Sequence, residues 1–410
     1  MPKIENILCH KILNSRGDWT IKTEVYLDDG SIGSQSVPEG ASKGDNEAVS
    51  LPVEKACNIV NTVINEALKG SEVYEQNTLD ELLLQMDGTE NKSNLGGNSI
   101  LSVSLALARA ASISKHIELY QYLEELLYGK QKDKEERSIP TPVFNIINGG
   151  KHASNNLSFQ EFMVIPSKHL NYSEALEAGV RIYNNLKQEL KKLDYDVGVG
   201  DEGGFAPRRM TVEKVFKIIK ETAKKDYEVG KEIFFGTDVA AGSFYNGKEY
   251  EIKEEGKVLN SDQLLLYYKE LIKSYEIIYL EDPFFERDFD AWKKGYNSLA
   301  DKLMVIGDDL VVTNMKYLEK AVKEKMINGV IVKPNQIGTL SETLSLIKKA
   351  KKEKINIIIS HRSGETGEDT FISDLSVASS AEFIKSGAPC RGERTVKYNR
   401  ILDIYYKNRI

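Results

Sequence analysis

Four apolar segments in the second half of the chain give the strongest indication of its fold: EIIYLED (276–282), LMVIGDD (303–309), GVIVKPN (329–335) and INIIISH (355–361). EIFFGTD (232–238) and EFIKSG (382–387) have the same form. Each segment is rich in Val, Ile, Leu, Phe or Tyr and ends in polar residues. Near-continuous apolar strands are typical of parallel sheets that are covered on both faces. We therefore expect a series of buried parallel strands here.

These segments recur at the interval of one strand plus one helix. Their terminal polar residues follow one another at 24 to 28 positions: Glu281, Asp308, Lys333, His361 and Lys385. Helical patterns lie between strands, as after Thr211, a good N-cap residue followed by Val212, Val215 and Phe216. So many consecutive units favour a closed (β/α)8 TIM-type barrel over an open doubly wound sheet. In such barrels the chemistry lies at the carboxyl ends of the strands.

The first third of the chain follows a different pattern. Residues 19–29 and 31–38 alternate like strands, and Asp29-Gly30 between them indicates a hairpin turn. Helical spacing follows at Ile100, Val103, Leu107 and Ala111. A charged stretch over 129–138 then precedes two prolines. We predict an N-terminal α+β domain over 1–131 and the barrel over 132–410.

Composition limits the classes of function. The 410 residues carry 55 Lys+Arg against 62 Asp+Glu, and this net charge of −7 argues against nucleic-acid binding. Cys9, Cys57 and Cys390 are too few for a disulfide framework and include no CxxC pair. We see neither a signal peptide nor an apolar run of the ~18 residues that suggests a membrane span. We expect a cytoplasmic protein without membrane or nucleic-acid partners.

Charged residues at the strand ends suggest a metal site. Asp238, Glu281 and Asp308 would converge from neighbouring strands, and their mutual repulsion would raise their pKa values unless a cation neutralises them. Oxygen ligands without Cys or His suit Mg²⁺, although three separate salt bridges remain an alternative. Lys333 and Lys385 would lie beside the metal, where burial and the cation would lower a lysine pKa and favour a general base. For Lys385, simple pairing with a metal-site carboxylate stays open.

Two loops can be interpreted chemically. The segment Ser360-His361-Arg362-Ser363 suits an anion, because arginine binds phosphate in a bidentate manner. A serine hydrolase is disfavoured by the absence of a GxSxG motif. The segment 198–203, GVGDEG, formally matches a dinucleotide motif, but its two carboxylates would repel a pyrophosphate. We interpret it as a loop that presents Glu202 to the site.

At these residues the sequence resembles the enolase family over nearly its whole length. The stretches that carry the resemblance are SFQEFMVIP (158–166), GDEGGFAP (200–207), LEDPF (280–284), GDDL (307–310), KPNQIGTLSET (333–343) and SHRSGET (360–366). NSRGD, EGASKG and MDGTENKSNLGGNSILSVSLALARA match in the N-terminal part. The resemblance implies Mg²⁺-dependent dehydration of 2-phospho-D-glycerate to phosphoenolpyruvate, in a barrel that begins with two strands and two helices.

The resemblance also implies a role for each matched residue. Asp238, Glu281 and Asp308 would hold the first Mg²⁺, and Ser42 a second that arrives with substrate. Lys333 would remove the C2 proton, and Glu202, supported by Glu161, would protonate the departing C3 hydroxyl. The remaining residues would bind substrate or line the site: Lys385 at the carboxylate, Arg362 and Ser363 at the phosphate, His361 beside them, His152 near the leaving hydroxyl, and Gln160.

The sequence departs from the family pattern in its first loop. The family has Ser-Gly-Ala-Ser-Thr-Gly and then a His, whereas this chain has Glu39 to Gly44 as EGASKG and Asn46 near the His position. The segment after Val49 is shortened, Gly367 looks like an insertion, and the C-terminus ends early. We expect a normal first metal site and a weaker second one. Alternatives are another enolase-superfamily lyase acting on a related acid, or an inactive paralogue that serves in binding. A homodimer or higher homo-oligomer is expected by resemblance.

Overall fold

The computed structural model describes all residues except 41–43, 45 and 410. Eight strands form a closed barrel in the order β10-β11-β12-β13-β4-β5-β6-β9. Their bounds are β4 Thr141–Asn148, β5 Glu161–Pro166, β6 Ile233–Asp238, β9 Ile277–Glu281, β10 Met304–Gly307, β11 Gly329–Val332, β12 Asn356–Ser360 and β13 Phe383–Lys385. All six predicted strands are present, each within its quoted segment, so the barrel prediction is confirmed.

The order of elements is two strands, two helices and then six strand–helix units. Strand β5 runs antiparallel to both β4 and β6, whereas the other neighbouring pairs are parallel. The barrel helices are α6 Tyr172–Lys192, α7 Val212–Ala223, α8 Ser261–Tyr275, α9 Phe289–Leu299, α10 Met315–Lys323, α12 Leu340–Lys352, α13 Phe371–Ala378 and α14 Gly392–Arg409. A short turn of helix, α11 Pro334–Ile337, precedes α12. Helix α7 begins as predicted, because the Thr211 side chain accepts the Lys214 N–H at 3.3 Å.

The barrel interior explains why reactive side chains gather at one end. Its filling is a cluster of eight buried side chains: Val143, Met163, Ile165, Tyr279, Ile306, Ile331, Ile358 and Phe383. Side chains alternate along a strand, so a residue two positions farther along points to the same side. Two positions beyond Tyr279, Ile306, Ile331 and Phe383 stand Glu281, Asp308, Lys333 and Lys385. The alternation that packs the barrel thus also turns these charges inward.

An N-terminal unit precedes the barrel. The strands β1 Ile4–Leu13, β2 Trp19–Leu27 and β3 Ile32–Ser36 form an antiparallel sheet, and the predicted hairpin is β2–β3. The helices are α1 Val53–Ile59, α2 Asn65–Leu68, α3 Gln76–Asp87, α4 Gly97–Ser114 and α5 Leu119–Tyr128, with a π-helical turn η1 at Val60–Ile64. Strand β1 was not predicted, since its sequence alternates poorly. The boundary after residue 131 falls between α5 and β4 and stays a prediction.

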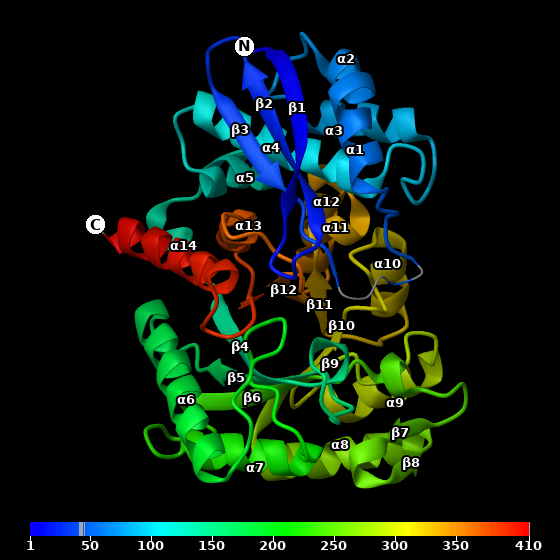
Figure 1. The fold of residues 1–410 in the computed structure, drawn as a ribbon, viewed down its shortest axis with the longest axis vertical. Coiled ribbons are helices and arrows are strands. Elements are labelled where there is room, and N and C mark those ends of the chain that lie inside the picture. The colour runs from blue at the N-terminus through cyan, green and yellow to red at the C-terminus, as the bar shows by residue number, and fades with distance from the viewer. Residues whose placement is uncertain (41–43, 45, 410) are drawn as a thin grey trace.

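The N-terminal unit lies against one end of the barrel, as Figure 1 shows. Helix α4 packs against α11 and α12, and α5 packs against α13. The loop after β3 reaches the carboxyl ends of the barrel strands, where Glu39 and Gly364 form a β-bridge. The site is therefore built from both units. Within the described part of the chain, none of the helices has the length and apolar character required to cross a bilayer.

Candidate active site

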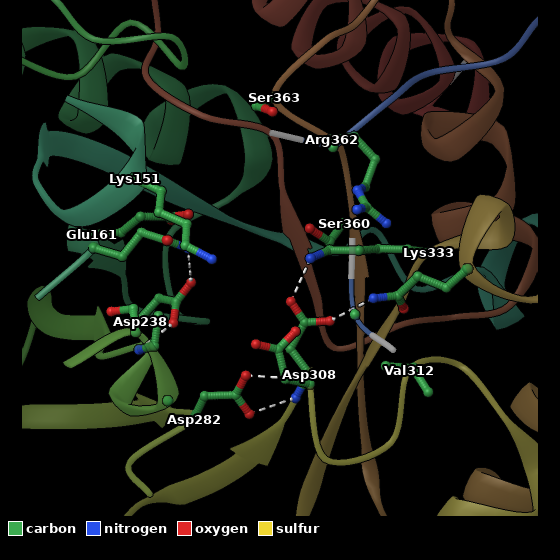
Figure 2. A pocket seen from close by; sticks show the side chains of 18 of the residues that line it. Lys151, Glu161, Asp238, Asp282, Asp308, Val312, Lys333, Ser360, Arg362 and Ser363 are labelled. Atoms are coloured by element: carbon green, nitrogen blue, oxygen red, sulfur yellow. Dashed lines mark hydrogen bonds and ion pairs between the residues drawn. The ribbon is translucent and has the colours of Figure 1, made fainter. Parts of the chain in front are cut away.

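A cavity of about 230 Å³ opens at the carboxyl ends of the barrel strands (Figure 2). Eleven of the predicted site residues line it: His152, Gln160, Glu161, Glu202, Asp238, Asp308, Lys333, His361, Arg362, Ser363 and Lys385. Glu281 is wholly buried below the cavity and contacts Lys385. Ser42 lies outside the described residues. The cavity is lined mostly by charged and polar groups, as expected for a site that binds a small, highly charged molecule.

The predicted metal carboxylates surround a lysine. Asp238 and Glu281 face each other in register on β6 and β9, and Asp308 follows β10, the next strand. Lys385 Nζ lies 2.9 Å and 3.0 Å from the two Glu281 oxygens and 3.4 Å from Asp238 Oδ2. Burial and the nearby Asp238 raise the pKa of Glu281 well above its ordinary value. The carboxylates thus concentrate negative charge that requires a cation.

These residues fit a hard divalent cation. Their donors are carboxylate oxygens, which Mg²⁺ prefers, and the buried Asp238 and Glu281 share the single ammonium of Lys385. The carboxylate oxygens of Asp238, Glu281 and Asp308 nevertheless do not all lie within 4.8 Å of one another. Among the described residues, possible ligand atoms within 4.8 Å of one another belong instead to two groups: the carboxylates Asp282, Asp308 and Asp309, and the set of His152, Glu161 and Glu202. Asp282 is already occupied, since it accepts the backbone N–H groups of Asp308 and Asp309 at 2.9 Å and 2.8 Å.

Lys333 and Asp308 form an ion pair on the other side of the cavity. Gln336 donates to the second Asp308 oxygen at 3.1 Å. The Thr313 hydroxyl donates to Gln336 at 2.7 Å and accepts the Lys333 N–H at 2.9 Å. These contacts form a closed, buried circuit that holds both Lys333 and Asp308 in position.

The lowered lysine pKa was expected from burial together with a bound cation, and the protein groups by themselves act in the opposite direction. Burial is the largest single influence and lowers the pKa of Lys333, but the neighbouring carboxylates, Asp308 foremost and then Glu281, together bring the net pKa above the ordinary value. The pKa of Lys385 is raised well above its ordinary value, because Glu161 and Glu281 outweigh burial. Asp308 likewise departs from the expectation for three repelling carboxylates: burial raises its pKa, but Lys333 lowers it more.

A carboxylate pair stands opposite Lys333. Strand β5, which begins at Glu161, is diametrically opposite β11 in the barrel order. Glu202 lies beside Glu161 on a loop, and Asn145 donates to Glu202 Oε2 at 2.9 Å. His152 Nδ1 lies 3.4 Å from Glu161 and 3.5 Å from Glu202. Burial and the Glu202 charge raise the pKa of Glu161. Burial also raises the pKa of Glu202, but His152, His361 and Arg394 together lower it well below its ordinary value.

The predicted anion loop is buried beside the N-terminal unit. Arg362 Nη1 lies 3.0 Å from Glu47 Oε2 and donates to Asn335 at 3.3 Å. A side chain at Gly40 would collide with this guanidinium, since a Cβ there would stand 1.9 Å from Arg362 Nη2. Burial lowers the pKa of Arg362 and Glu47 raises it more, so the net direction is upward. The anion loop thus faces a carboxylate of the N-terminal segment.

Gln160 holds a predicted ligand in place, because its amide donates to Asp238 Oδ2 at 3.1 Å. Sequence reasoning missed several groups that shape the site: Glu47, Asn145, Tyr279, Asp282, Gln336 and Arg394. Asp282 and Gln336 stand inside the quoted LEDPF and KPNQIGT motifs, just after strands that carry site residues, and this position was a usable signal. Glu47 and Arg394 carried no such signal, because their partners come from remote segments.

Comparison with known protein families agrees with this geometry. The family model described as enolase, C-terminal TIM barrel domain, matches residues 136–407, and the model described as enolase, N-terminal domain, matches residues 4–123. This chain belongs to the enolase family. Enolase-family membership accounts for the two-strand start of the barrel and for charged groups at its carboxyl end. It supports a lyase of the enolase superfamily that acts on a small molecule.

Proposed function

We propose that this enolase-family chain dehydrates 2-phospho-D-glycerate to phosphoenolpyruvate and requires Mg²⁺. One observation carries the proposal: Lys333 and the Glu161–Glu202 pair stand on opposite sides of one cavity, with Asp238 and Lys385 between them. Removal of a proton from one carbon and of a hydroxyl from the next requires a base and an acid at separate positions. Figure 2 shows Lys333 and Arg362 across the cavity from Glu161 and Asp238.

Lys333 is the proposed base. Lys333 must first lose its own proton, which pairing with Asp308 opposes and which a cation held by Asp308 would favour. The neutral amine then accepts the C2 proton, and the electron pair of the C–H bond moves toward the substrate carboxylate to form an enediolate. Asp308, Gln336 and Thr313 hold the lysine in place. The ammonium of Lys385 stabilises the negative charge that develops on the carboxylate oxygens.

Glu202 is the proposed acid, and Glu161 supports it. As the C3–O bond breaks, the departing hydroxyl takes a proton from Glu202 and leaves as water, while the enediolate electrons form the C2–C3 double bond. His152, within 3.5 Å of both carboxylates, lies near the leaving group. Arg362 and Ser363 are proposed to bind the phosphate, with His361 beside them and Gln160 lining the site.

Asp238, Glu281 and Asp308 would hold Mg²⁺, which when bound supplies positive charge beside the substrate carboxylate. Ser42 is proposed to help bind a second Mg²⁺ together with substrate. We further propose a cytoplasmic homodimer or higher homo-oligomer, in keeping with the family resemblance.

A direct assay tests the proposal. Purified protein is mixed with 2-phosphoglycerate and Mg²⁺, and the absorbance of the enol phosphate is followed. We expect absorbance to rise, and to stop rising when a chelator removes Mg²⁺. No turnover of 2-phosphoglycerate, combined with turnover of an unphosphorylated hydroxy acid, would reject this function in favour of a different enolase-superfamily lyase.

A further inference from the structure

A buried arginine of the last helix ties together the two loops that carry the proposed acid and the proposed phosphate site. Arg394, in α14, has no exposed surface. Its guanidinium donates to the backbone carbonyls of Arg362 at 2.7 Å and Ser363 at 2.6 Å, and to that of Asp201 at 3.2 Å. Asp201 immediately precedes Glu202. One side chain thus fixes both loops at once.

The same guanidinium also determines which ring nitrogen of His361 carries the proton. Arg394 Nη1 lies 2.5 Å from His361 Nδ1. A guanidinium has donors and no acceptor, so Nδ1 must accept this hydrogen bond. Burial lowers the pKa of His361 to about 3, with Arg394 contributing, so the imidazole is neutral. A neutral imidazole that accepts at Nδ1 carries its proton on Nε2.

The proton of His361 therefore points toward Glu202. His361 Nε2 lies 3.4 Å from Glu202 Oε1. The packing around this contact is tight: Gly387 has φ of +76°, and a Cβ there would lie 2.6 Å from the Glu202 carbonyl, 3.1 Å from Arg394 and 3.2 Å from His361. His361 and Arg394 have little room to rotate away.

We propose that Arg394 is a positioning residue that sets the His361 tautomer and so the orientation of the Glu202 carboxylate. Arg394 contacts neither substrate nor metal in this scheme; it acts through His361 and through the loop carbonyls. The consequence for catalysis rests on the proposed function, whereas the tautomer does not. Because a misplacement of about 1 Å can cost about 10²-fold in rate, loss of the guanidinium should impair the acid step strongly.

The tautomer is measured without substrate. The chain has five histidines, so selective ¹⁵N-histidine labelling and long-range ¹H–¹⁵N correlation spectra can resolve His361, assigned by its loss in His361→Asn. We expect the Nε2–H tautomer in the wild type and an added Nδ1–H population in Arg394→Met. Arg394→Lys keeps a hydrogen-bond donor and should therefore retain the wild-type tautomer. If Arg394→Met does not fold, the tautomer is measured in Arg394→Lys and in the wild type.

Arg400→Met is the matched control. Arg400 lies on the same helix, but its guanidinium pairs with Asp374 and Glu118 instead of with the loops. It should reduce stability and leave the His361 tautomer unchanged. A His361 tautomer in Arg394→Met identical to that of the wild type would overturn the inference, and so would an Nδ1–H tautomer in the wild type.

Kinetics give the second readout. In Arg394→Met, dehydration should fall about 10²-fold while exchange of the C2 proton with solvent falls much less, because Lys333 is not touched. Equal losses of both activities would contradict a role through Glu202. Lack of dehydration by the wild type would reject the proposed function alone, since the tautomer result would stand.

Discussion

The Lys385 ammonium and the Glu281 carboxylate form a fully buried ion pair, with Nζ 2.9 Å and 3.0 Å from the two oxygens. The same ammonium lies 3.2 Å from Glu161 and 3.4 Å from Asp238. Lys385 therefore joins the proposed metal site to the proposed acid pair. Its charge offsets a repulsion that would otherwise oppose folding of this end of the barrel.

Replacing Lys385 should make stability depend on Mg²⁺. Lys385→Met leaves buried carboxylates without their partner, which typically costs about 3–5 kcal/mol. A divalent cation that binds only the folded state should recover part of this loss. Thermal unfolding is measured with and without Mg²⁺, and the rise in Tm should be larger in the variant than in the wild type. Equal rises in both proteins would show that lysine and cation do not neutralise the same carboxylates.

Asp87 should contribute stability that depends on pH. Burial raises its pKa, but hydrogen bonds from Thr89, Leu95 and Asn94 lower it more, and the net pKa is below 3.8. Stability from a depressed carboxyl pKa is complete above the unfolded value and is lost as pH falls through the folded value. Asp87→Asn should therefore cost about 1–2 kcal/mol from pH 8 to 5, and less below about pH 4. Urea unfolding of both proteins from pH 8 to below pH 4 measures this difference in unfolding free energy. A difference that grows toward low pH would contradict a depressed pKa for Asp87.

Glu47 should compete with substrate for Arg362. The carboxylate lies 3.0 Å from the guanidinium that we propose binds phosphate. Glu47→Gln removes the competing charge, so KM for 2-phosphoglycerate should fall by about 10-fold, the equivalent of about 1.4 kcal/mol, with little change in kcat. Initial rates at saturating Mg²⁺ measure both constants. An increase in KM would show instead that Glu47 holds Arg362 in its binding position.

Lys333 should be required for the first proton transfer. Lys333→Ala should abolish dehydration and also exchange of the C2 proton with solvent, while substrate still binds. Deuterium incorporation at C2 is followed in heavy water, with binding measured by calorimetry. Normal exchange in this variant would assign the base to another group.

The barrel and the charges at its strand ends could be predicted because both depend on local pattern, whereas Glu161, His152 and Gln160 were expected only from the family resemblance. Strands such as those ending near Glu281 and Lys333 can be recognised because an apolar run is followed by a charged residue. The alternation of side chains along a strand then places these charges inside the barrel. The pairing of those charges could not be predicted. Whether Lys385 contacts Glu281, or Glu47 contacts Arg362, depends on side-chain positions that several remote segments set together.

The raised Lys333 pKa could not be predicted for a related reason. Strand spacing showed that Asp308 and Lys333 would be neighbours, but not that they would pair directly and that Asp308 and Glu281 together would raise the lysine pKa. Arg394 was missed because its partners are backbone carbonyls, which leave no trace in the residue types of the loops. Ser42 lies outside the described residues, so its proposed role stays a prediction.

Lys333 and Glu202 should act on different atoms of the substrate, so their two steps can be measured separately in one variant. Glu202→Gln is incubated with 2-phosphoglycerate and Mg²⁺ in heavy water, and both C2 deuterium incorporation and phosphoenolpyruvate are followed, with Lys333→Ala as the control that should exchange no proton. We predict that Glu202→Gln exchanges the C2 proton but forms almost no phosphoenolpyruvate. Loss of both activities, with folding and substrate binding unchanged, would contradict separate acid and base residues.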